Sequence, residues 1–429
     1  MSIKNYLKFV IPSIMSMIIF QLYTMVDGIY IANIVGDTAL SAVNLSAPFI
    51  NGLFSFAILF ATGTSTLVSI YLGEGKKDKA RSLFTLNFTF LSICGIVITI
   101  LSHFFFKEIA YFLGATEVTL PYVKSYLGVL IYFSYFYIVS YSLEVLVKAD
   151  GYPIISTLAI IVGAITNIVL DGVLMIIFHM GIFGAAIATG LSQVLTFSIF
   201  FIHFMKKKGP LYFSSFQFNL SVYKKIIPLG LSDFFTEISA GYIVFILNHA
   251  ILKYIGNEGV TTYTVLTYIY NIILMSFTGI AQGTQPQISY YHGKKDKEKI
   301  QTLLKYAFQT TLIVSIISLI ISECFTSNLI QIFISKENSN LFHNSIIAMK
   351  EYSLCYIVAG YNIVTASYFA SIEKSKYSFT ISSLRGFVCI TLSVLFISFI
   401  GKGTGIWFSS LLSEFLCFIV SILIFKKNV

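Results

Sequence analysis

The chain has 429 residues, of which 56% are hydrophobic and only 11% are charged, and its mean hydropathy is +0.84. A folded protein of this length cannot expose so few charges to water, so the composition excludes a water-soluble globular domain and indicates that the lipid bilayer is the solvent. The net charge of +9 is compatible with a nucleic-acid partner, but the placement of the charges along the chain indicates membrane topology instead.

Apolar segments long enough to cross roughly 30 Å of hydrocarbon recur along the whole chain. In chain order they predict twelve transmembrane helices, at residues 9–35, 44–72, 83–106, 122–147, 154–178, 182–204, 226–252, 260–291, 303–325, 348–371, 378–400 and 404–425. Lys4 and Lys8 open the chain and no small-residue cleavage site precedes Pro12, so we expect the first segment to remain as a helix. The predicted fold is an all-α integral membrane protein.

Lysines and arginines gather in alternate connecting segments. If the N-terminus lies inside, the inner segments and the termini hold 21 of them and the outer segments hold six. Those six are Lys107, Lys124, Lys253, Lys336, Lys350 and Lys402. By the positive-inside rule we expect a multi-pass protein of the cell (cytoplasmic) membrane with both termini in the cytoplasm and no nucleic-acid partner. A polybasic lipid or nucleic-acid site at residues 206–208 is the alternative interpretation of part of this charge.

The sequence contains an internal repeat. A shift of 220 residues, without a gap, superposes eight identical pairs: Gly36 on Gly256, Asn51 on Asn271, Ala61 on Ala281, Gly63 on Gly283, Thr64 on Thr284, Ser69 on Ser289, Tyr71 on Tyr291 and Gly73 on Gly293. Six helices per half is an even number, so both halves enter the membrane from the same side and form a parallel repeat, which is a transporter architecture. We expect a six-helix bundle at residues 1–208, a cytoplasmic linker at 209–225 and a second six-helix bundle at 226–429. A purely structural duplication is the alternative.

Acidic residues inside the predicted spans are costly, because an ionised group in hydrocarbon needs a partner or a water-filled cavity. Asp27 and Asp171 each lie roughly 10 to 12 Å beneath the outer surface, as counted along their helices, and Thr189 reaches the same depth. Asn167 lies one turn below Asp171 on the same helix face. We therefore expect two carboxylates, a carboxamide and a hydroxyl in one layer of the N-terminal half, without a basic residue in the membrane interior of that half.

Two carboxylates without a basic partner cannot both remain ionised at low cost, so either one keeps a proton or a cation binds between them. Ligands that are all oxygens suit a hard ion such as Na⁺. The alternative for Asp27 alone is a helix-end charge that reaches water, and for Asn167 and Thr189 it is ordinary interhelical hydrogen bonding. An aspartate is too short to reach water from two turns inside a helix, so the pair favours cation coupling.

In the C-terminal half, Asp233 and Arg385 lie about 7 residues from the cytoplasmic ends of their helices, so a structural ion pair is the first interpretation. Glu237 and Glu414 are candidates for binding a cationic substrate or a second proton, and Gln282 and Gln285 are further candidates for substrate contacts. Glu144 and Lys148 form an i,i+4 pair that we interpret as a solvated helix terminus.

Cysteines and histidines point to no redox or metal chemistry. The five cysteines lie inside or at the ends of predicted spans without a CxxC motif, and the six histidines have no metal-ligand spacing. We expect no cofactor and, apart from a coupling ion, no bound metal.

Three segments resemble the MATE (multidrug and toxic compound extrusion) family. They are Met25-Val-Asp27-Gly-Ile-Tyr-Ile-Ala-Asn, the stretch from Gly36 to Gly73 that ends Val-Ser-Ile-Tyr-Leu-Gly, and Gly283-Thr-Gln-Pro286-Gln-Ile-Ser-Tyr-Tyr-His-Gly293. The resemblance covers nearly the whole chain, including the helix number and the duplication. It implies that Asp27, Asn167, Asp171 and Thr189 bind Na⁺ or H⁺ in exchange for an outward-moving organic cation. Glu237 matches the acidic residue that some members carry on helix 7 only loosely, because its spacing from the preceding glycine differs.

The leading hypothesis is thus a monomeric, cation-coupled antiporter that exports small, lipophilic organic cations by alternating access. One alternative is a flippase for lipid-linked oligosaccharides or other amphipathic lipids, whose anionic substrates require several basic residues in the cleft, whereas only Arg385 is available. A second alternative is an intramembrane enzyme, for which the scattered histidines provide no catalytic constellation. The sequence does not choose between Na⁺ and H⁺.

Overall fold

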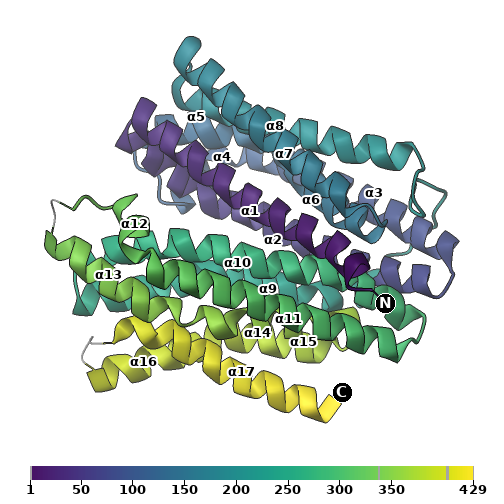
Figure 1. Cartoon of the computed structure of the whole chain (residues 1–429). Helices are drawn as coiled ribbons and strands as arrows, with labels where there is room; N and C mark the ends of the chain where they lie inside the picture. The colour runs from purple at the N-terminus through teal and green to yellow at the C-terminus, as the bar shows by residue number, and fades with distance from the viewer. Residues whose placement is uncertain (1, 337–338, 402–404, 429) are drawn as a thin grey trace. The chain divides into compact units, whose positions relative to one another are not determined.

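The computed structural model describes residues 2–336, 339–401 and 405–428, so Lys402 lies outside the described residues. The described chain is mostly helical and holds no strand (Figure 1). Its α-helices are α1 (Ile3–Ile34), α2 (Asp37–Gly73), α3 (Lys77–Phe104), α4 (Phe106–Phe112), α5 (Leu120–Leu130), α6 (Ser134–Ala149), α7 (Pro153–Asp171), α8 (Gly181–Met205), α9 (Tyr223–Tyr254), α10 (Asn257–Gly293), α11 (Lys297–Cys324), α12 (Thr326–Gln331), α13 (Ser339–Ser353), α14 (Tyr356–Ser371), α15 (Ser375–Ser383), α16 (Ile390–Gly401) and α17 (Ser409–Asn428). Two π-helical segments, Gly172–Ile177 and Leu384–Cys389, continue α7 and α15.

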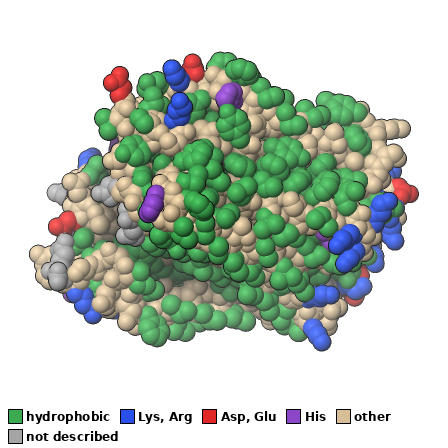
Figure 2. Space-filling model, turned by 90° about the horizontal axis from the view of Figure 1, so that it is seen from above, with side chains coloured by type: hydrophobic (Ala, Val, Ile, Leu, Met, Phe, Trp, Pro, Cys, Tyr) green, Lys and Arg blue, Asp and Glu red, His purple; other side chains and the backbone are tan. Residues whose placement is uncertain are grey.

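The number of membrane spans agrees with the prediction. Eleven helical stretches of the described chain are long and apolar enough to cross a membrane, and α13 with α14 passes the same test as a pair bent by 42°. Counting this pair as one span gives twelve, which confirms the predicted all-α, twelve-helix fold. The predicted continuous helix at 348–371 is wrong in its interior, because α13 ends at Ser353 and α14 begins at Tyr356. Figure 2 shows hydrophobic side chains over most of the face in view and basic side chains mainly toward its edges, as a bilayer requires.

The helices form two compact units. One unit comprises residues 11–230 and 289–296, and the other comprises residues 1–10, 231–288 and 297–429. In the first unit α2 packs against α3, α5 and α6, while α7 packs along α8. In the second unit α14 is central and packs against α11, α15 and α17. Alanines such as Ala39, Ala42 and Ala57, all fully buried, allow the helices around α2 to approach closely.

The connector that follows α8 is attached to the first unit. Asp150, buried at the end of α6, accepts hydrogen bonds from the Leu211 amide at 2.6 Å and from His203 Nε2 at 2.8 Å. The Tyr152 hydroxyl donates to the Lys208 carbonyl at 2.9 Å. Burial raises the pKa of Asp150, although the hydrogen bonds from His203 and Leu211 lower it. These contacts hold residues 208–211 against the ends of α6 and α8.

The internal repeat is visible as a reciprocal contact between α2 and α10. A Cβ added at Gly73 would collide with the carbonyl oxygen of Tyr290, and one added at Gly293 would collide with the carbonyl oxygen of Ile70. Gly73 and Gly293 superpose under the shift of 220 residues, and so do Ile70 and Tyr290. The two helices therefore meet backbone to backbone through equivalent residues, a contact that glycine alone permits.

We expect Gly73→Ala and Gly293→Ala each to destabilise the protein by about 1 to 3 kcal/mol, because the added methyl group must push two backbones apart. Gly52→Ala on the same helix α2 is the matched control, since a Cβ there meets nothing within 4 Å. Thermal unfolding of the purified protein in detergent measures the effect. Equal melting temperatures for Gly73→Ala and Gly52→Ala would contradict the close contact.

Candidate functional site

Two buried carboxyl groups lie together in the first unit. Asp27 comes from α1 and is 9% exposed, and Asp171, the last residue of α7, is fully buried. Each carboxyl group lies within electrostatic reach of the other. Asp27 and Asp171, which the sequence places at equal depth on two separate helices, are therefore close to each other in the structure.

Asn167 and Thr189 lie beside this pair. Asn167, one turn before Asp171 on α7, is fully buried and its Nδ2 donates to Thr189 Oγ1 on α8 at 3.3 Å. The Thr189 hydroxyl in turn donates to the Ala185 carbonyl of its own helix at 2.9 Å. The carboxamide nitrogen of Asn167 is thus hydrogen-bonded, whereas its oxygen receives no hydrogen bond.

Several acceptor oxygens in this cluster have no hydrogen-bond donor. They are Asp27 Oδ1, Asn167 Oδ1 and both carboxylate oxygens of Asp171, all buried. A buried polar oxygen without a donor costs about 1 to 3 kcal/mol, and more when it is charged. A set of acceptors without a donor can be satisfied by a proton or by a hard cation that takes oxygen ligands.

Basic residues do not neutralise the pair. In the described part of the chain, neither aspartate forms an ion pair with a lysine or arginine. Lys148 is buried in the same unit, which corrects the expectation of a solvated helix terminus, but its ammonium contacts Glu144 at 2.8 Å. Glu144 also accepts from Ser156 on α7 at 3.2 Å, about 16 Å below Asn167 along that helix. The ion pair of Glu144 and Lys148 therefore lies at another depth along α7 than Asn167.

Three tyrosines lie near the carboxyl groups, and none of them is a site residue predicted from the sequence. Tyr126 and Tyr137 are buried on α5 and α6, and both lie within electrostatic reach of Asp27. Tyr23 lies one turn below Asp27 on α1 and interacts with it as well. Tyrosines are frequent throughout the chain, so only tertiary packing distinguishes these three from the tyrosines at the membrane interface.

Asp171 stands directly before a π-helical segment, Gly172–Ile177. A π-helical turn contains one more residue than an α-helical turn, so it rotates the side chains that precede it relative to those that follow. Such turns are frequent at functional sites. The second π-helical segment, Leu384–Cys389, contains Arg385, the basic residue that the sequence places inside a predicted span of the C-terminal half.

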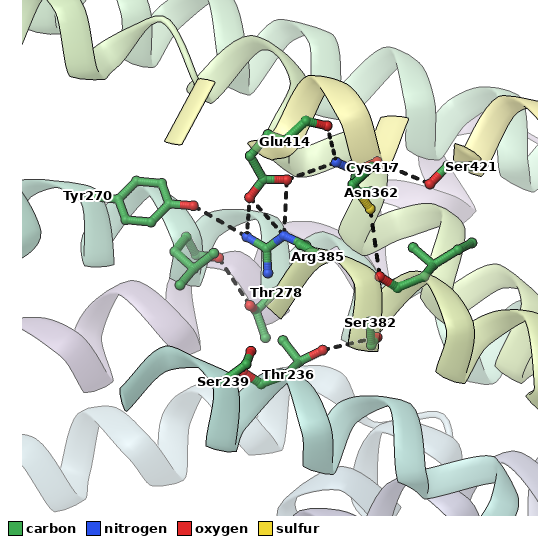
Figure 3. Close-up of polar contacts among 12 residues, drawn as sticks. Thr236, Ser239, Tyr270, Thr278, Asn362, Ser382, Arg385, Glu414, Cys417 and Ser421 are labelled. Atoms are coloured by element: carbon green, nitrogen blue, oxygen red, sulfur yellow. Dashed lines mark hydrogen bonds and ion pairs between the residues drawn. The ribbon is translucent and has the colours of Figure 1, made fainter. Parts of the chain in front are cut away.

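Arg385 belongs to a satisfied network in the second unit (Figure 3). Its guanidinium contacts Glu414 on α17 through Nε at 2.8 Å and Nη2 at 2.8 Å, and Nη2 also donates to the Tyr270 hydroxyl at 3.3 Å. Asn362 on α14 donates to the Glu414 carboxylate at 2.8 Å and accepts from Ser421 at 3.2 Å. The charged groups in this network therefore have both a counter-ion and neutral hydrogen-bond partners.

The expected partner of Arg385 is Asp233, whereas the ion pair in the structure joins Arg385 to Glu414, a residue expected to bind substrate. Depth along the helices did not separate the two acids, because it carries no information on which helix lies next to Arg385. Among the other substrate candidates, Glu237 on α9 and Gln282 on α10 are half-buried, and Gln285 is buried.

Comparisons with known proteins cover nearly the whole chain. The family model MatE matches residues 12–173 and 234–397. The multidrug export protein MepA of Staphylococcus saprophyticus is 25% identical over 98% of this chain and 93% of its own length, and MepA of Staphylococcus aureus is 23% identical over the same shares. A solved structure described as the outward-facing conformation of a multidrug resistance MATE family transporter has a TM-score of 0.94 at 22% identity, covering 99% of this chain and 95% of that one. A transporter from Pyrococcus furiosus, with a title that reports reverse polarity of its binding pocket, has a TM-score of 0.92 at 22% identity and the same coverage.

We expect Arg385→Met to destabilise the protein by about 3 to 5 kcal/mol, because it leaves the Glu414 carboxylate buried without its counter-ion. The double variant Arg385→Met/Glu414→Leu replaces the pair by apolar side chains and should recover most of that loss. Thermal unfolding of the three proteins in detergent gives the comparison. If Arg385→Met has the melting temperature of the unmodified protein, the ion pair does not stabilise the fold.

Proposed function

The chain belongs to the MatE family, whose members are transport proteins and not enzymes, and on that premise we propose that it exports small organic cations in exchange for Na⁺ or H⁺. The names of the MepA proteins and the titles of the solved MATE structures support multidrug export as the general activity. The observation that carries the coupling hypothesis is the buried set of acceptor oxygens at Asp27, Asn167 and Asp171 that lack donors.

The proposed site couples ion binding to a change of shape through elementary electrostatics. Two ionised carboxylates in a medium of low dielectric constant repel each other, and a shared cation reverses the sign of the interaction. Because Asp27 lies on α1 and Asp171 on α7, cation binding draws these helices together and proton or Na⁺ release lets them separate. The ion then favours one conformation of the first unit over the other by the difference in its affinity for the two.

Asn167 and Thr189 have a positioning role in this proposal. The hydrogen bond from Asn167 Nδ2 to Thr189 Oγ1 fixes the carboxamide and leaves its oxygen without a donor, so that the oxygen is available as a cation ligand. Thr189 completes the set as a neutral oxygen ligand. An oxygen-only site with two carboxylates matches the ligand preference of Na⁺, and the same carboxylates are proton acceptors.

For the transport cycle we propose alternating access between the two halves of the repeat, predicted at 1–208 and 226–429 and joined at 209–225, with substrate entering from the cytoplasm or the inner leaflet. The protein acts as a monomer in the cell membrane, with both termini in the cytoplasm. Glu237, Gln282 and Gln285 are the side chains that we propose for contact with a cationic substrate.

A flippase for lipid-linked oligosaccharides is the second candidate, and the Arg385 network counts against it. An anionic substrate needs basic groups that are free to bind it, whereas the guanidinium of Arg385 is bound to Glu414 and Tyr270. We therefore favour organic cations as the substrate class.

We expect Asp27→Asn and Asp171→Asn each to reduce gradient-driven efflux at least about 100-fold while the protein still inserts and folds, because each change removes a cation ligand with little change of volume. Asp78→Asn is the matched control, since the Asp78 side chain is 98% exposed. Efflux of a fluorescent organic cation from cells that express equal amounts of each protein measures the effect. If both site variants show the efflux of the unmodified protein, Asp27 and Asp171 are not the cation-coupling residues.

We also expect a Na⁺ or pH gradient, imposed across vesicles that contain the purified protein, to drive substrate movement against its own concentration gradient. Collapse of that gradient with an ionophore should stop accumulation, because the substrate then has no coupled source of free energy. Accumulation that persists without any ion gradient contradicts antiport. Comparison of the two gradients identifies the coupling ion.

A further inference from the structure

A cavity of about 460 Å³ opens at one end of the first unit, and its lining does not include Asp27 or Asp171. Its lining residues come from the end of α3, from the short helix α4 and from α5 with the turn that follows it. The helix α1 ends at the same end of the unit. Its apolar lining includes Phe104, Phe106, Val129 and Ile131. None of these residues has a role in cation coupling or in the ion pair of the second unit.

Charged and polar side chains line the rest of the cavity. Lys107 and Lys124 contribute two ammonium groups, and Glu108 contributes one carboxylate. The Tyr132 hydroxyl and His103 Nδ1 are hydrogen-bonded to each other at 2.8 Å and form a further polar edge. With histidine neutral, the charged lining carries a net charge of +1, which complements a ligand with a single negative charge.

Exposed aromatic side chains place this cavity at the membrane–water boundary. Tyr132, which lines the cavity, is 57% exposed, and Tyr111 on the short helix α4 is 51% exposed. Exposed tyrosine rings gather at the level of the lipid headgroups, because they are apolar with a polar hydroxyl. The lysines of the cavity are therefore at the depth at which a phosphate group is found.

An apolar ridge on α3 leads from the cavity into the membrane. Ile96, Ile100 and Phe104 follow one another at helical spacing, and all three are about half exposed or more. Ile93, Val97 and Leu101 form a parallel row beside them, with similar exposure. From Ile93 to Phe104 the helix rises roughly 16 Å, which is about half of the 30 Å hydrocarbon thickness and matches the reach of one acyl chain.

We propose that this cavity binds an anionic phospholipid. The phosphate lies between Lys107 and Lys124, the glycerol part lies over Gly128, and one acyl chain follows the ridge of α3. Gly128 lines the cavity, and a Cβ added there meets Phe106 and Lys124 only at ordinary contact distances of 3.7 and 3.8 Å. An alanine at position 128 therefore fits, whereas a leucine projects into the volume that the lipid occupies.

Binding of fluorescent phosphatidylglycerol to the delipidated full-length protein in detergent micelles tests the proposal. The double variant Lys107→Gln/Lys124→Gln should bind this lipid at least about tenfold more weakly, since each lysine contributes a substantial part of the attraction to an anionic headgroup. Lys253→Gln/Lys350→Gln, which removes two exposed lysines of the second unit, is the charge-matched control and should bind as the unmodified protein does.

Gly128→Leu and Gly128→Ala provide a test that does not depend on charge. We expect Gly128→Leu to lose binding and Gly128→Ala to keep it, with equal melting temperatures for the two variants. The proposal is overturned if the double lysine variant binds phosphatidylglycerol normally or if Gly128→Leu binds as well as Gly128→Ala. It is overturned too if phosphatidylethanolamine or phosphatidylcholine binds as tightly as phosphatidylglycerol, because a preference for the anionic headgroup is its central element.

Discussion

Two carboxyl groups buried side by side in a low-dielectric interior must acquire positive charge, and the arrangement of the first unit depends on this constraint. Asp27 and Asp171 come from helices far apart in the sequence, and acceptor oxygens around them lack donors. A protein that needed these residues only for packing would lose nothing by replacing them with apolar side chains, as buried ion pairs can be. The loss of stability that these buried carboxyl groups cause is explained if they bind a proton or a cation in each transport cycle.

The second unit meets the same constraint in the opposite way. There Glu414 has a resident counter-ion in Arg385, and Asn362 and Tyr270 supply neutral hydrogen bonds (Figure 3). A carboxylate with a permanent cation has no need of an exchangeable one. The internal repeat has therefore kept the helices and the glycine contacts in both halves, while the buried charges have diverged. The proposed ion coupling therefore belongs to the first unit.

Much of this arrangement follows from the sequence because helices in a bilayer are long and rise by a constant 1.5 Å per residue. Counting residues along each helix gives the depths of Asp27, Asn167, Asp171 and Thr189. Residues at equal depth lie close together when their helices are neighbours in the same membrane. Counting carries no information about which helices are neighbours or about rotation around their axes. For that reason the sequence favours Asp233 as the partner of Arg385, whereas the structure shows Glu414 in that place. It likewise predicts a solvated pair of Glu144 and Lys148, although both residues are buried. The break between α13 and α14 was missed because no proline or glycine marks it.

Infrared difference spectroscopy of the purified protein is the most direct test of the central claim, because it observes carboxyl groups themselves. The spectrum recorded on addition of Na⁺, or on acidification, should contain carboxyl bands that disappear in Asp171→Asn and remain in Asp78→Asn. Such bands would show that the buried pair takes up the cation. Identical difference spectra for the unmodified protein and for Asp171→Asn would contradict the account.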